Sequence, residues 1–142
     1  IIKKNKNNFL LETKADILFS YGYTEEATKF YKKNLEKYPL NYYAQIRIFE
    51  NIKIKNLTNI ETEIIFQNNK DLLYKYYNNK NVLFKYFELA QKLNKKEWLQ
   101  FFNFLLSIND IKKEDFDIEI KNFKNTNDRD LLKLVNIIHN LN

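Results

Sequence analysis

Apolar residues recur along most of this chain at the spacing of one face of an α-helix. The segment TEEATKFYKKNLEKY shows the pattern most clearly, because its apolar residues fall near positions i, i+3, i+4 and i+8: Ala27, Phe30, Tyr31, Leu35 and Tyr38. Thr24 stands where an N-cap is expected, and Glu25 and Glu26 favour the positive end of the helix dipole. The pattern predicts an amphipathic helix over this segment.

The only glycine and the only proline of the chain flank this segment. Pro39 cannot continue a helix, and it pushes Tyr38 out of helical geometry. Gly22 suits the left-handed position that ends a helix, and the preceding FLLETKADILFSY has its own apolar face: Leu11, Ala15, Leu18 and Phe19. Together the two segments predict an antiparallel helical hairpin that turns at Gly22 and stops at Pro39.

The same periodicity continues to the C-terminus. It predicts further helices over residues 41–55, 58–69, 70–78, 81–93, 95–108, 112–124 and 127–141. Thr58 and Glu61 form a capping-box pattern, and Asn127, Asp128 and Asp130 are placed to cap the last helix. A β-rich fold needs turn residues at regular intervals, which this sequence lacks. We expect an all-α fold with one helical-repeat domain over residues 1–142 and a flexible or fraying N-terminus over residues 1–7.

The predicted hairpin resembles a tetratricopeptide repeat in a frame from Asn8 to Asn41. The matching residues are small or apolar at the helix contact, together with the turn glycine and the late proline: Leu11, Ala15, Leu18, Gly22, Ala27, Tyr31, Leu35 and Pro39. Pro39, Asn41 and Ala44 look like the step into a next repeat, whereas the continued frame departs from the pattern at Phe49, Glu61 and Leu73. The resemblance implies antiparallel hairpins stacked as a short α-solenoid. The alternative is an irregular α-helical bundle.

Composition limits the chemistry. The chain has 44% hydrophobic and 16% aromatic residues, which is too much for a disordered tail. It has no Cys, so disulfides and thiolate metal sites are excluded, in keeping with either the cytoplasm or the periplasm. A net charge of +6 is spread thinly, as on a solvated surface. The heavy use of Asn, Lys, Ile, Tyr and Phe is typical of an AT-rich genome. The absence of Met, even at position 1, suggests a fragment of a longer chain that could lack an upstream signal or anchor.

No group of residues has the spacing of a catalytic or cofactor site. His139 is the only His and lies near the end of the last predicted helix, where a cation suits the dipole. With one Gly there is no P-loop and no dinucleotide-binding turn. An acidic cluster is better explained as a solvated helix start than as a cation site: Glu114, Asp115, Asp117 and Glu119. We therefore expect no enzyme activity, no cofactor and no metal.

The function that the sequence favours is a non-catalytic protein-interaction scaffold. The resemblance implies a concave groove that binds a peptide or a helix of a partner. The candidate binding residues are the groove-facing positions implied by the repeat, with Trp98 added because clustered aromatics cannot all face a core: Glu12, Asp16, Phe19, Tyr43, Arg47, Glu50 and Trp98. Tetratricopeptide domains that clamp a C-terminal carboxylate carry Lys and Asn on the first helix, where this chain has Glu12 and Asp16. The expected partner is therefore a protein of mixed or basic charge.

Two alternatives stay open. The positive net charge and the many Tyr and Phe residues would suit an RNA- or DNA-binding helical domain, but no basic cluster is interleaved with aromatics and no known nucleic-acid motif is present. The chain could also be a dimerisation or docking module of a larger protein. No apolar run is long enough for a membrane span, so we expect no membrane insertion by this segment.

Overall fold

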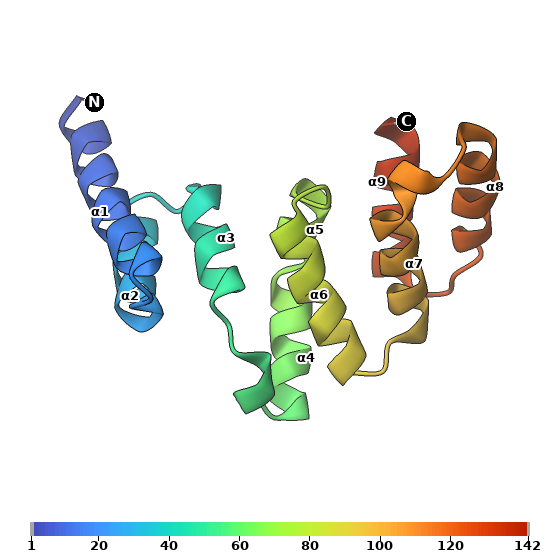
Figure 1. The fold of residues 1–142 in the computed structure, drawn as a ribbon, viewed down its shortest axis with the longest axis horizontal. Helices are drawn as coiled ribbons and strands as arrows, with labels where there is room; N and C mark the ends of the chain where they lie inside the picture. Colours follow the sequence, from blue (N-terminus) through green and yellow to red (C-terminus); the bar gives the residue numbers. More distant parts are fainter. Residues whose placement is uncertain (1, 142) are drawn as a thin grey trace. The chain divides into compact units, whose positions relative to one another are not determined.

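The computed structural model describes the backbone of residues 2–141 and the side chains of residues 10–140 (Figure 1). Over this part of the chain the secondary structure is helical without strands, which confirms the all-α prediction. The elements are α1 (Ile2–Ser20), α2 (Thr24–Lys37), α3 (Tyr42–Glu50), η1 (Ile54–Asn56), α4 (Asn59–Asn68), α5 (Lys70–Lys75), α6 (Lys80–Lys92), α7 (Lys96–Leu106), η2 (Ile108–Asp110), α8 (Lys113–Phe123) and α9 (Arg129–Leu141). The flexible N-terminus expected over residues 1–7 falls where side chains lie outside the described residues.

The turn between α1 and α2 forms as the sequence predicts. Gly22 has a φ of +85°, its N–H bonds to the carbonyl of Phe19 at 3.0 Å, and the Tyr23 N–H bonds to the carbonyl of Leu18 at 2.9 Å. This pair of bonds is the Schellman motif, in which a left-handed residue satisfies the last carbonyls of a helix. At the other end of α2, Tyr38 leaves helical geometry before the proline, as expected.

A second left-handed residue, which the sequence analysis did not single out, ends α6. Asn94 has a φ of +54°, and the Lys95 N–H bonds to the carbonyl of Ala90 at 3.0 Å. Asn tolerates this conformation better than other residues with a side chain, so it takes the place that Gly22 takes in the first turn. The link between α6 and α7 is therefore another tight helical turn.

Helix starts agree with the sequence at two positions and differ at one. Thr58 and Glu61 form the predicted capping box, with both bonds at 3.1 Å. Asp128 accepts the N–H groups of Asp130 and Leu131, so it caps the start of α9 as expected. Thr24, in contrast, is already inside α2. The N-cap is Tyr23, one residue earlier than predicted, and its side chain makes no capping bond. The Schellman turn places the Tyr23 carbonyl where it accepts the first helical hydrogen bond, from the Ala27 N–H.

Two predicted helices are shorter than expected. The segment 41–55 forms α3 only as far as Glu50, and a separate turn of 3₁₀-helix, η1, follows with Ile54 buried. The segment 70–78 forms α5 only as far as Lys75, after which Tyr76 adopts a non-helical conformation. Periodicity alone overestimates these helices because apolar residues beyond their ends are held by tertiary contacts rather than by helix geometry.

The chain divides into two compact units, Ile1–Lys55 and Asn56–Asn142, and each is described by itself. In the first unit α1 packs on α2 and α2 packs on α3. Its core includes a cluster of three alanines and one tyrosine that are fully buried: Ala15, Ala27, Tyr31 and Ala44. Small residues let helices approach closely, as expected for Ala15 and Ala27. The single repeat domain and the solenoid arrangement stay predictions.

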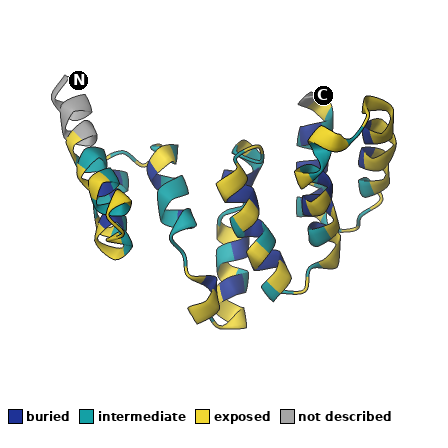
Figure 2. Cartoon of the chain, viewed as in Figure 1, coloured by how far each residue is buried: buried dark blue, intermediate teal, exposed yellow. Residues whose placement is uncertain are grey.

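The second unit has an aromatic core around α7, which is covered on two sides (Figure 2). On one side the ring centroid of Trp98 lies 5.1 Å from that of Phe66 on α4, and the Trp98 ring also packs against Phe102. On the other side Phe101 and Phe104 pack against rings of α8 at 4.9 and 5.5 Å. The predicted apolar face of α9 is also buried where side chains are described: Leu131, Leu134, Val135 and Ile138.

Candidate functional site

Six of the seven candidate residues lie on two neighbouring stripes of the first unit. Helix geometry aligns residues spaced i, i+4 and i+7, so α1 presents Glu12, Asp16 and Phe19 on one face. Helix α3 presents a second stripe with the same spacing: Tyr43, Arg47 and Glu50. We refer to these six residues as the α1–α3 surface.

Arg47 joins the two stripes. Its guanidinium carbon lies 4.6 Å from the ring centroid of Phe19 and 5.2 Å from that of Tyr43, within the range of a cation–π contact. The Nε–H donates to the Tyr43 hydroxyl at 3.2 Å, and a terminal nitrogen pairs with Glu50 at 3.3 Å. Burial lowers the pKa of Arg47, but the bond to Tyr43 and the charge of Glu50 outweigh it, and the net pKa is raised. The guanidinium is therefore held in one place as a cation.

Asp16 connects all three helices of the unit. Its carboxylate accepts a hydrogen bond from the hydroxyl of Tyr31 on α2 and another, at 2.9 Å, from the hydroxyl of Tyr43 on α3. Burial, and then the bond to Asp16, raise the pKa of Tyr31. The Tyr31 hydroxyl thus stays protonated, and the acidic side chain fixes the position of the exposed Tyr43 ring.

Glu12 reaches the start of α3 through Asn41. The Asn41 amide donates to the carboxylate of Glu12 and to the side-chain oxygen of Asn34 at 2.6 Å, while its own side-chain oxygen caps α3 at the Ala44 N–H. Asn34 is fully buried and belongs to this network, although the sequence patterns did not predict a role for it. Its position, three residues after Tyr31 and seven after Ala27 on the buried stripe of α2, is the signal that could have identified it.

The α1–α3 surface is only partly exposed and carries excess negative charge. Tyr43 is 41% exposed, and the other five residues are half-buried. Three carboxylates stand against one guanidinium, which leaves an excess of two negative charges. The surface therefore offers an accessible aromatic ring next to a fixed cation, within an acidic surrounding.

Trp98 does not belong to this surface. It lies in the second unit and is only 2% exposed, and its indole N–H donates to Asp128 at 2.8 Å. Because α7 is packed on two sides, its clustered aromatics find core positions on both faces and none of these rings is left for a partner. Trp98 is thus placed as a core residue.

The remaining chemistry of the described residues is sparse. His139 is half-buried, and its Nδ1 is enclosed without a hydrogen-bond partner. The acidic residues of α8 are all exposed, as expected for a solvated helix start: Glu114, Asp115, Asp117 and Glu119. Within the described part of the chain, His, Asp and Glu side chains nowhere gather in threes as a metal site would require. Nor does any described helix have both the length and the apolar character needed to cross a bilayer.

Comparison of the chain with protein-family models, with curated proteins and with solved structures finds no match in any of the three. The tetratricopeptide resemblance therefore rests on the residues of the first hairpin alone, and the α1–α3 surface is the feature of the chain that bears on function.

Proposed function

We propose that the chain is a non-catalytic interaction scaffold and that a partner protein binds the α1–α3 surface. The observation that carries the proposal is the position of Arg47, stacked on the rings of Phe19 and Tyr43 where Tyr43 stays 41% exposed. Aromatic and Arg side chains contribute most to the affinity of protein interfaces. In this chain an Arg side chain, Arg47, and an exposed aromatic ring, Tyr43, are in contact at the surface.

The side chains are also fixed before a partner arrives. Tyr43 is held by Asp16 and Arg47, and Arg47 is held in turn by Glu50. Ordering a free side chain on binding costs about 0.5–1.5 kcal/mol, so groups that are already ordered retain more of their contact energy as affinity. A preorganised Tyr–Arg pair supports a binding role better than a pair of mobile side chains would.

The charge of the surface favours a partner of mixed or basic charge. Glu12, Asp16 and Glu50 surround the single guanidinium, and a partner carboxylate would meet net repulsion there. Complementary charge steers association and suppresses wrong partners more than it adds affinity. A Lys or Arg side chain beside an apolar anchor is the partner chemistry that fits.

The proposal can be tested by selecting random displayed peptides on the immobilised chain. We expect the enriched peptides to carry net positive charge and to lose binding to a Tyr43→Ala variant. Tyr23→Ala is the matched control, because Tyr23 is a 59% exposed tyrosine of the same unit that lies outside the surface. Peptides that are acidic, or that bind Tyr43→Ala as well as wild type, would refute the proposal.

An isosteric change separates binding from folding. Asp16→Asn keeps an oxygen that accepts the hydroxyl bonds of Tyr31 and Tyr43 but removes the negative charge. We expect this variant to keep its helical circular dichroism signal while its affinity for the basic peptides falls. Unchanged affinity would mean that the acidic surrounding plays no part in recognition.

A further inference from the structure

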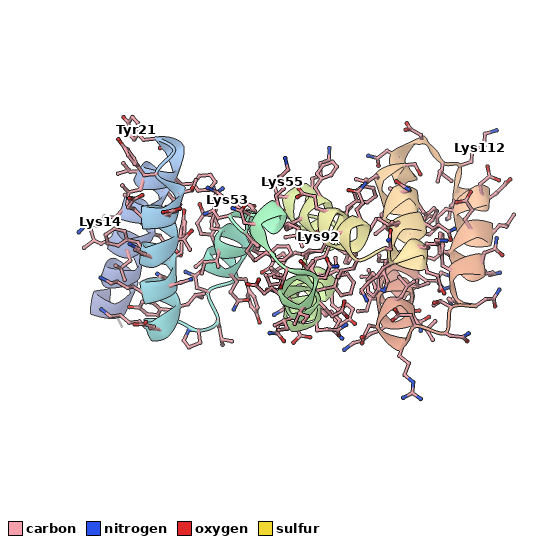
Figure 3. All side chains as sticks on the ribbon, turned by 90° about the horizontal axis from the view of Figure 1, so that it is seen from below. Lys14, Tyr21, Lys53, Lys55, Lys92 and Lys112 are labelled. Carbon is pink, nitrogen blue, oxygen red and sulfur yellow. The ribbon has the colours of Figure 1, made fainter. Side chains whose placement is uncertain are left out.

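The first unit has an exposed face on the side of α1 away from α3, where Figure 3 shows Lys14 projecting outward. Leu10, Ile17 and Tyr21 share this side with Lys14, and each is more than half exposed. The Lys14 ammonium lies 5.8 Å from the ring centroid of Phe30 on α2, so the face continues onto that helix.

On α2 this face contains a shallow hollow of about 370 Å³ beside Phe30. Its lining is one aromatic ring with a charged rim: Glu26, Lys29, Phe30, Lys32, Lys33 and Glu36. With Lys14 the rim has four lysines and two glutamates, an excess of two positive charges. We call this surface of α1 and α2 the basic face.

The second unit has a surface of similar build and opposite charge on α8. One side of α8 buries Phe116 and Ile120, while Ile118 on another side is 61% exposed. Ile118 lines a hollow of about 330 Å³ whose lining is otherwise mainly acidic: Asp110, Ile111, Lys112, Asp115, Ile118 and Glu119. Three carboxylates and one lysine leave an excess of two negative charges. We call this surface the acidic face.

We infer that the basic face of one copy of the chain binds the acidic face of a second copy. Each face has an apolar centre, Phe30 or Ile118, inside a charged rim, which is the composition of a protein interface. Two basic faces, or two acidic faces, would repel one another, because like charges would meet across the contact. The two faces suit one another, since four lysines and two glutamates oppose three carboxylates and one lysine.

A contact between two different faces has a consequence for symmetry. It is heterologous, so a pair of bound copies still exposes one free basic face and one free acidic face, and association continues head to tail unless a ring closes. This inference is independent of the proposed function, because none of these residues belongs to the α1–α3 surface.

Sedimentation of the full 142-residue chain tests the inference. We expect the mean mass to rise with protein concentration at low ionic strength and to fall back to the monomer in high salt. Screening lengths of about 10 Å at 0.1 M and about 3 Å at 1 M give the physical reason.

Charge reversals locate the contact. Lys29→Glu with Lys33→Glu converts the basic face, and Asp115→Lys with Glu119→Lys converts the acidic face; all four side chains are exposed, so folding should be kept. We expect each double variant to lose the concentration-dependent mass. An equimolar mixture of the two should regain it, because every face then meets a complementary face on the other variant.

The matched control is Lys53→Glu with Lys55→Glu, which makes the same charge change at two exposed lysines of the first unit (Figure 3). It should associate like the wild type. The inference is overturned if the wild type stays monomeric at every concentration in low salt, in which case solvent or another protein covers these faces. It is equally overturned if the control loses association to the same extent, or if the mixture of variants remains monomeric.

Discussion

Removal of the Tyr31 hydroxyl should weaken the first unit without disturbing its packing. The Tyr31 ring is fully buried, while its hydroxyl donates to Asp16. Tyr31→Phe keeps the ring but removes one of the two hydroxyl groups that donate to the Asp16 carboxylate. The other donor, the Tyr43 hydroxyl at 2.9 Å, is retained. A hydrogen bond to a charged group contributes about 1.5–3 kcal/mol. Because Asp16 is half-buried and can recruit water in exchange, we expect a loss of about 1–1.5 kcal/mol, at or below the low end of that range.

Urea unfolding followed by circular dichroism measures this loss. With a slope of about 2 kcal/mol per M, the midpoint should fall by about 0.5–0.75 M while the slope stays the same. Tyr23→Phe is the control, because Tyr23 is exposed and removal of its hydroxyl should leave the midpoint unchanged. Equal midpoints for Tyr31→Phe and wild type would refute the argument that the Asp16 bond stabilises the unit.

The same tyrosine predicts a pH dependence. Burial, followed by the bond to Asp16, raises the pKa of Tyr31, whereas a tyrosine in the unfolded chain titrates near pH ~10. Above that pH the folded state holds a proton that the unfolded state has lost, so stability falls as pH rises. The stability associated with the protonated Tyr31 hydroxyl is fully present below pH ~10. It is lost as the pH rises from there toward the higher pKa that Tyr31 has in the folded state. Tyr31→Phe should therefore lose less stability in alkali than wild type, and identical alkaline slopes would contradict the assignment.

Three further changes test the packing, the α1–α3 surface and a cap. Ala27→Leu should overpack a fully buried site and cost about 1–3 kcal/mol; a wild-type midpoint would mean that this site can expand. Tyr43→Ala with Arg47→Ala should lower stability by about 1–2 kcal/mol, since Arg47 gives up one ion pair and its aromatic contacts, and should also abolish binding of selected peptides. Thr58→Ala should cost about 1 kcal/mol in thermal or urea unfolding by removing the capping box, and Thr58→Ser should restore most of it.

Local signals in the sequence predict most of the secondary structure and much of the α1–α3 surface. Gly22 and Pro39 mark their helix ends because their backbone constraints act within a few residues. The capping box of Thr58 and Glu61 is local for the same reason. The α1–α3 surface followed from a repeat frame that placed two stripes, and the structure adds the contacts between them.

The differences from the sequence prediction arise where distant contacts decide. Trp98 was expected at a surface, but its burial depends on Phe66 and Asp128, which stand about 30 residues away on either side. The buried stripe of α2 includes Asn34, but periodicity does not report the bond from Asn41 that satisfies its side-chain oxygen. Asn94 ends a helix in a left-handed conformation that Asn adopts only in some contexts.

The packing of α7 on two sides also limits which substitutions that helix can accept. Its exposed positions form a strip along the side that neither set of rings covers: Lys96, Glu97, Gln100, Asn103 and Leu106. The buried half of the helix is shared between two sets of ring contacts, so a replacement there disturbs the packing against α4 or the packing against α8. Random mutagenesis of this helix should therefore recover folded variants mainly at the strip, and related sequences should differ from this chain there first.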